Sequence, residues 1–281
     1  MNNIKEFDSV RELGQWLRDT PRANNAGNVS IDLSDPEWYG HVSWDEALND
    51  YALCGGLWRE GSAKMARMQV ETDAIATPGP APALDLSVTG FMVDVGEYLA
   101  GNPECFYSDE CFYGDEEEQE THSAPVIRIA VSTSRNHNVT AENSLMYGAA
   151  ILSLIDAIEE AGTRVELHAV CDNRVWRGSK IDRVYIATCI KQAHAHWSPD
   201  SVAFSMAHPA FHRRLCFGAM ERLGGITNGN SYGAGSRHPA VNDLCDVYFP
   251  RIDAPGWVNT AEKAFSYVNK VYSAAIGARN E

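Results

Sequence analysis

The stretch "RIAVSTSRNHNVTAEN", residues 128–143, combines the end of an apolar run, a Ser-x-Ser turn and the start of a helix. The run "VIRIAV" (126–131) is short and apolar, which is typical of a central strand. After the turn, Thr140 favours the start of a helix that reaches Ala161 and is apolar over much of its girth. We expect that helix to lie against a sheet, because its apolar surface is too wide to face water.

Strands and helices alternate after this stretch, which predicts an α/β domain. The segments 164–176 and 182–197 have strand patterns and are joined by a short turn, so they predict an antiparallel hairpin. The other expected elements are a strand over 200–207, a helix that opens at Pro209, a strand over 246–252 and a helix over 260–275.

The N-terminal segment has a helical pattern. Apolar residues in "SVRELGQWL" (9–17) fall on one helical face. Ser43 and Glu46 form a capping box at the start of a second helix, and a third is expected from about 57 to 73. We therefore predict a small helical N-terminal lobe over residues 1–76.

Residues 77–123 predict a Pro-rich linker followed by an acidic, irregular segment. "TPGPAPA" (77–83) holds three prolines and one glycine, which favours extended backbone. Eight acidic residues and no basic one lie between Glu104 and Glu120, so the run 115–120 is expected to be a solvated loop. The α/β domain is accordingly placed at 124–281.

The net charge of −15 lies almost wholly in the first part of the chain. Residues 1–120 carry 7 Lys or Arg against 24 Asp or Glu, whereas residues 121–281 carry 16 against 14. Because an acidic surface repels phosphates, direct nucleic-acid binding through the N-terminal half is not expected.

Seven scattered cysteines without a Cys-x-x-Cys pair indicate reduced thiols and argue against a disulfide scaffold or a zinc ribbon. The start of the chain lacks the pattern of a secretion signal, and the apolar stretch 145–155 is too short to cross a bilayer. We therefore expect a cytoplasmic protein without a membrane partner.

The order of elements over about 124–276, together with the Ser132-x-Ser134 turn, resembles the von Willebrand factor type A domain. This resemblance implies a type A-like open sheet with helices on both faces. In that family two serines and two aspartates lie at a divalent ion. Ser132 and Ser134 match the serines, but Ala130 and Ala207 stand where the aspartates are expected. Since Mg²⁺ needs charged oxygen ligands, we expect no metal and no other cofactor at this turn.

Three segments resemble a family encoded mostly by tailed bacteriophages, for which no activity is established. They are "WYGHVSWDEALNDYALCGGLWREGSAKM" (38–65), "VDVGEYLAGNPECF" (93–106) and "HPAFHRRLCFGAMERL" (208–223). The resemblance implies a phage origin. We expect the protein in the host cytoplasm, with incorporation into the virion as the open alternative.

The candidate binding residues lie where the turn and the helix after the expected fourth strand approach the same end of the sheet. Open α/β sheets bind ligands outside the carboxyl ends of their strands. The candidate surface comprises Ser132, Ser134, Asn136, His208, Arg213 and Arg214. The alternative is that the two arginines are an ordinary solvated pair.

Two histidine pairs have spacings that could begin a metal site. His208 and His212 are four residues apart at a helix start, and His194 and His196 are two apart on a strand. No acidic or thiol partner lies at a recognised spacing, so we expect no metal there, with His208 capping the helix and His212 exposed.

The sequence offers no nucleophile elbow, phosphate loop or dinucleotide fingerprint, so no catalytic residue is predicted. Our first hypothesis is a non-enzymatic phage protein that presents the top of its sheet to a phage or host protein. The second is an acidic inhibitor that mimics nucleic acid and occupies the basic groove of a host enzyme. The third is a metal-dependent hydrolase at Ser132 or at the histidines.

Overall fold

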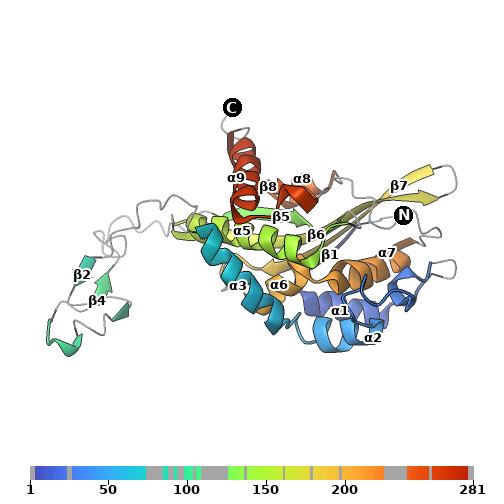
Figure 1. Cartoon of the computed structure of the whole chain (residues 1–281), viewed down its shortest axis with the longest axis horizontal. Helices are drawn as coiled ribbons and strands as arrows, with labels where there is room; N and C mark the ends of the chain where they lie inside the picture. The colour runs from blue at the N-terminus through green and yellow to red at the C-terminus, as the bar shows by residue number, and fades with distance from the viewer. Residues whose placement is uncertain are drawn as a thin grey trace, which may run out of the picture.

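A mixed five-stranded sheet forms the centre of the computed structural model (Figure 1). Its strand order is β1(Ile4–Phe7), β7(Lys180–Lys191), β6(Arg164–Arg177), β5(Val126–Ser132), β8(Val247–Phe249). β7 runs antiparallel to β6, and the other three neighbouring pairs are parallel. The structure describes residues 4–23, 27–73, 85–87, 92–93, 98–103, 106–108, 126–135, 138–160, 162–177, 180–195, 198–224, 239–252 and 255–277.

Among the described residues, helices pack mainly on one face of this sheet, and most of the expected ones are confirmed. Their bounds are α1(Val10–Asp19), α2(Trp44–Glu46), the π-helix η2(Ala47–Ala52), α3(Arg59–Asp73), α5(Ala141–Glu160), α6(Pro199–Ala207), the π-helix η4(Phe211–Cys216), α7(Phe217–Gly224), α8(Val241–Leu244) and α9(Ala261–Gly277). Short 3₁₀ turns occur at η1(Val29–Ile31) and η6(Pro255–Trp257). The chain is thus an α/β protein, as the alternating pattern predicts.

The long hairpin is confirmed. β6 and β7 pair in antiparallel register from Leu167 opposite Lys191 to Arg177 opposite Lys180, with a register shift between Leu167 and His168. Parallel pairing of β5 with β6, from Val126 opposite Arg164 onward, then places the end of β5 in the middle of the sheet.

The prediction of a strand over 200–207 is wrong, because this segment is helix α6. Ser198 caps the helix by accepting a hydrogen bond from the Ser201 backbone N–H, and Pro199 occupies the first turn. Residues 201–207 are all buried, and a short apolar run of this kind fits a buried helix as well as a strand. The strand beside β5 is instead β8, which is shorter than the expected 246–252.

The N-terminal region is not only helical. Residues 4–7 form β1, which extends the sheet by pairing in parallel with β7, with Ile4 opposite Tyr185. Of its four residues only Phe7 is buried, so the strand has too weak a pattern to be recognised in the sequence.

The two faces of the sheet are covered differently. Ile127, Ile129 and Val131 of β5 point into the large core, which also includes side chains of α1, η2, α3, α5, α6, η4, α7 and α9. Ala130 points to the opposite face, into a small cluster with Val241 from α8. This alternation is that of a central strand with apolar contacts on both sides.

The described parts of residues 1–76 and 124–281 pack into the same large core. The division into a helical lobe and an α/β domain stays a prediction. Between them, β2(Asp85–Ser87), β3(Met92–Val93) and β4(Phe106–Ser108) form a small antiparallel sheet that lies to one side of the main sheet (Figure 1). The acidic run 115–120 lies outside the described residues.

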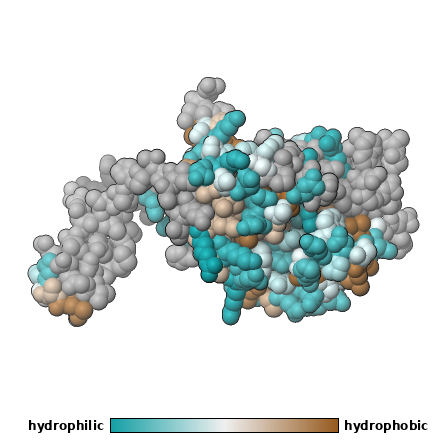
Figure 2. All heavy atoms as spheres, viewed as in Figure 1, coloured by the Kyte–Doolittle hydropathy of each residue, from teal (hydrophilic) through white to brown (hydrophobic). Residues whose placement is uncertain are grey.

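The described surface seen in Figure 2 is mainly hydrophilic, and its apolar residues form small separate groups. Within the described part of the chain, no helix is both long and apolar enough to span a membrane.

Gly14 sets the distance between α1 and η2. A Cβ at this position would lie 2.9 Å from the Cβ of Ala52 and 3.2 Å from the backbone of Ala52 and Leu53. Because the neighbouring atoms belong mostly to backbone, they cannot move aside as a flexible side chain could.

We expect Gly14→Val to lower the free energy of unfolding by about 2 kcal/mol, since it overpacks this contact. Urea denaturation measures the change. Gly256→Val is the matched control, because a Cβ at Gly256 has no heavy atom within 4 Å. An equal loss in both variants would contradict the close approach of α1 and η2.

Candidate functional site

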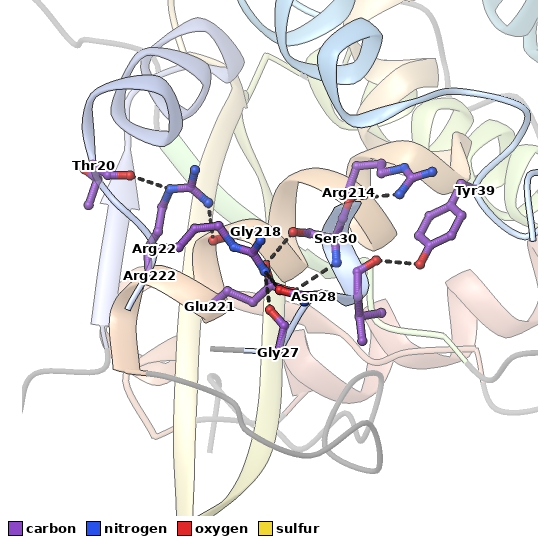
Figure 3. Close-up of polar contacts among 11 residues, drawn as sticks. Thr20, Arg22, Gly27, Asn28, Ser30, Tyr39, Arg214, Gly218, Glu221 and Arg222 are labelled. Carbon is purple, nitrogen blue, oxygen red and sulfur yellow. Dashed lines mark hydrogen bonds and ion pairs between the residues drawn. The ribbon is translucent and has the colours of Figure 1, made fainter. Parts of the chain in front are cut away.

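Arg214 lies in η4 and binds the backbone of residues 30–42, which we call the N-terminal segment (Figure 3). Its Nε donates to the carbonyl of Val42 at 3.0 Å, and its Nη1 donates to the carbonyls of Ser30 at 2.9 Å and Asp32 at 2.7 Å. The guanidinium carbon lies 3.3 Å from the ring centroid of Tyr39. At 1% exposure, Arg214 is a buried structural residue, and it does not lie on the predicted binding surface.

Glu221 of α7, seven residues after Arg214, binds the same segment. Its buried carboxylate accepts from the Ser30 backbone N–H at 3.0 Å and from the Ser30 hydroxyl, and it forms an ion pair with Arg22 at 2.8 Å. Arg222 donates its Nε to the carbonyl of Thr20 at 2.7 Å (Figure 3). These contacts fix where residues 35–40 pass the carboxyl end of β5.

A cavity of about 460 Å³ lies at that end of the sheet. Its wall includes Arg135, just after β5, and residues 138–141, which lead into α5. The N-terminal segment contributes residues from 35 to 40, and the start of η4 contributes His212 and Arg213. The cavity therefore lies where open α/β sheets usually bind ligands.

Two buried or half-buried arginines give the cavity positive charge. Arg135 donates its Nη1 to the carbonyl of Ala207 at 3.0 Å and its Nη2 to the carbonyl of Met206. Arg213 donates to the carbonyl of Trp38, and its guanidinium carbon lies 4.6 Å from the Trp38 ring centroid. Burial lowers the pKa of Arg135 to about 9 and that of Arg213 to about 10, so both are charged at pH 7.

Two buried histidines lie beside these arginines. The Nδ1 of His208 accepts from the Ala210 backbone N–H at 3.1 Å, and its ring packs edge-on against Trp58 at 4.6 Å. Burial, together with the charge of Arg135, lowers the pKa of His208 to about 4. Burial and the two arginines also hold the pKa of His212 well below its usual range, so both rings are neutral at pH 7.

The structure brings together only part of the predicted surface. His208 and Arg213 line the cavity, whereas Ser132 and Ser134 are buried and do not. The Ser132 hydroxyl donates to Asp172 at 2.9 Å, and that of Ser134 to the side-chain oxygen of Asn173 at 3.1 Å. These serines are therefore occupied by contacts inside the sheet.

The remaining predicted positions divide into buried, exposed and undescribed residues. Asn136 and His196 lie outside the described residues, and His194 is exposed. The expectation of an exposed His212 is wrong, because its ring is 3% exposed and packs 4.8 Å from the Phe217 ring. Within the described ranges, no group of three or more His, Cys, Asp or Glu could hold a metal ion.

Sequence reasoning missed Arg135 and Trp38 as cavity residues. Arg135 follows Ser134 directly, so its position after a central strand was a usable signal. No sequence signal marks Trp38, because its position depends on contacts between residues 30–42 and a helix more than 170 residues later.

These features define a mixed α/β protein with a cation-lined cavity at the carboxyl end of a central strand. The chain belongs to the family described as "Domain of unknown function (DUF7192)", whose model matches residues 2–273. Comparison with curated proteins gave no match. Comparison with solved structures gave none either.

Replacing Arg214 by lysine should lower the free energy of unfolding by about 3 kcal/mol, because one ammonium cannot reproduce three directed bonds and the stacking on Tyr39. Guanidinium denaturation measures the loss. The control Arg18→Lys changes an exposed residue paired with Asp19 and should stay within about 0.5 kcal/mol of wild type. Equal losses would show that Arg214 does not hold the N-terminal segment in place.

Acid should destabilise the fold through His208. In the unfolded chain this imidazole binds a proton near pH 6.5, but in the fold only near pH 4, so the unfolded state holds more protons between these values. The contribution of His208 to the free energy of unfolding should therefore fall by about 3 kcal/mol as the pH drops from about 6.5 to about 4.

A neutral replacement tests this effect. In His208→Asn the amide oxygen can accept from Ala210, and melting temperatures measured across this pH range should fall less steeply than in wild type. The exposed His194→Asn should keep the wild-type slope. An unchanged slope in His208→Asn would assign the acid sensitivity to other groups.

Proposed function

We propose that this chain is a non-enzymatic binding module that docks a protein partner over the cavity at the carboxyl end of β5. The observation that carries the proposal is the placement of Arg135 and Arg213 in one cavity. Neither arginine forms an ion pair within the described parts of the chain. The carboxylate of Asp35 on the same lining attracts Arg213, whereas the charge of Arg135 has no such carboxylate beside it and can act on a partner.

Charge complementarity indicates the kind of partner. The interior of the cavity has two guanidinium groups, whereas Asp35 and Glu37 on its lining are exposed. A protein that inserts an anionic side chain and flanks it with basic residues would match both features.

The interior serines favour binding over catalysis. Ser132 and Ser134 are buried and donate to Asp172 and Asn173, and among the described contacts neither is bonded to a histidine that could act as a general base. Burial also raises the pKa of the nearby Cys171 thiol well above its usual range, which suppresses its thiolate.

The proposal also includes a phage origin and a von Willebrand factor type A-like sheet. The succession β5, α5, β6, β7 supports a type A-like sheet, although helix α6 stands where that family has a strand. The resemblance of residues 38–65, 93–106 and 208–223 to phage proteins supports a phage origin and a site of action in the host cytoplasm.

Ala141→Glu tests the docking site, because it places a carboxylate of the chain itself at the cavity wall. Glutamate is favourable in the first turn of a helix, so α5 should remain intact. After affinity purification from phage-infected cells, the recovered partner should bind purified wild type at least tenfold more tightly than Ala141→Glu.

Ala274→Glu is the matched control, since it adds the same charge at an exposed position of α9 and should bind like wild type. Failure to recover a partner, or equal affinity of Ala141→Glu and wild type, would reject the proposed function.

A further inference from the structure

We infer that the interior of the cavity is a binding site for a phosphoryl group, formed by His212, Arg135, Arg213 and the N-terminus of α5. The inference deepens the proposed function and rests on it for one point only, which is that a protein partner can supply the group.

His212 provides the observation that points to a ligand. Its side chain is 3% exposed and lines the cavity, yet its Nε2 has no hydrogen-bond partner among the described residues. Buried polar atoms in native proteins are nearly always bonded. Five side-chain atoms in the described ranges are exceptions, and of these only the His212 Nε2 belongs to a residue on the cavity lining. A ligand oxygen bound in the cavity would supply the missing partner.

The two arginines supply charge in fixed orientations. The bonds from Arg135 to the end of α6 hold its guanidinium beside the cavity, and Trp38 holds that of Arg213 through its carbonyl and its ring. Both groups are ordered before any ligand arrives, so binding costs little side-chain entropy. Arginines held in this way are typical of oxyanion sites.

Helix α5 adds a third source of positive potential. It is 20 residues long, and the Thr140 hydroxyl accepts from the Asn143 backbone N–H at 3.1 Å, which caps the helix. The first backbone N–H groups of a helix have no partner within the helix, and Ala141 in this turn lines the cavity. Helix N-termini of this kind bind phosphate readily.

The arrangement favours a tetrahedral phosphoryl group over a planar carboxylate. The donors come from three separate elements that line the one cavity, namely the segment after β5, the start of α5 and η4. Donors from different elements suit a tetrahedral group better than a planar one. A volume of about 460 Å³ is that of a cavity for a whole small ligand, not for one ion. The phosphoryl group is therefore carried by a larger molecule, either a free phosphate monoester or a phosphorylated side chain of the partner.

His212→Phe separates binding from folding. Phenylalanine keeps the ring against Phe217 but removes the unpartnered nitrogen, so the free protein should be as stable as wild type or more so. Calorimetric titration of the full chain with inorganic phosphate at constant ionic strength should show binding that is about tenfold weaker in this variant. The exposed His194→Phe should bind phosphate like wild type.

Ala141→Pro provides a second variant in case His212→Phe does not fold. Proline is accepted in the first turn of a helix, so circular dichroism should be unchanged, but the variant lacks the backbone N–H that we assign to the phosphoryl group. Its phosphate affinity should also fall. No phosphate binding by wild type, equal binding by both variants and wild type, or equally tight binding of acetate would each overturn the inference.

Two further probes identify the source of the group. Tighter binding of phenyl phosphate than of a phosphoserine heptapeptide would assign the site to a free monoester, and the reverse order would assign it to a partner protein. Recovery of a partner without any phosphoryl binding would reject this inference and leave the proposed function standing. Phosphoryl binding without recovery of a partner would support this inference and reject the proposed function.

Discussion

The hydrogen bonds from one buried guanidinium to three backbone carbonyls determine how the rest of this molecule is arranged. Arg214 binds the carbonyls of Ser30, Asp32 and Val42. Glu221, seven residues later, binds the Ser30 backbone N–H (Figure 3). Backbone groups buried without partners would be costly, so this irregular segment can lie over a helix only because charged side chains satisfy it. The segment in turn places Trp38 at the end of the sheet. Without that support the cavity would lack one of its walls.

The same chemistry explains the character of the cavity. Charged groups leave water only where bonds fix them, and here Arg135 and Arg213 are fixed by carbonyls and an aromatic ring, with no ion pair in the described ranges. Asp35 on the cavity lining offsets part of the charge of Arg213, whereas no carboxylate in the described ranges forms an ion pair with Arg135. The neutral, buried His212 adds a polar nitrogen without a partner. Such a site is arranged for a negatively charged group that comes from outside.

Local signals in the sequence were sufficient for much of the fold and for little of the site. The capping box of Ser43 and Glu46 and the long hairpin depend on neighbouring residues, and both were predicted. The segment 200–207 was misread because it is buried on every side, which removes the periodicity that distinguishes helix from strand. Arg213 and Arg214 are adjacent and chemically identical, yet one lines the cavity and the other fastens the N-terminal segment. Which arginine does which depends on contacts with residues 30–42, and no local pattern reports contacts that distant.

The edge position of β1 has a consequence for how the chain acquires its structure during synthesis. Ile4 pairs with Tyr185 and Ser30 with Glu221, so both residues are synthesised long before their partners. Contacts of such long sequence separation slow folding, because a large loop must close before they form. Until then the outer edge of β7 is open to other strands in a crowded cell. We therefore expect residues 4–7 to remain unpaired until β7 has left the ribosome.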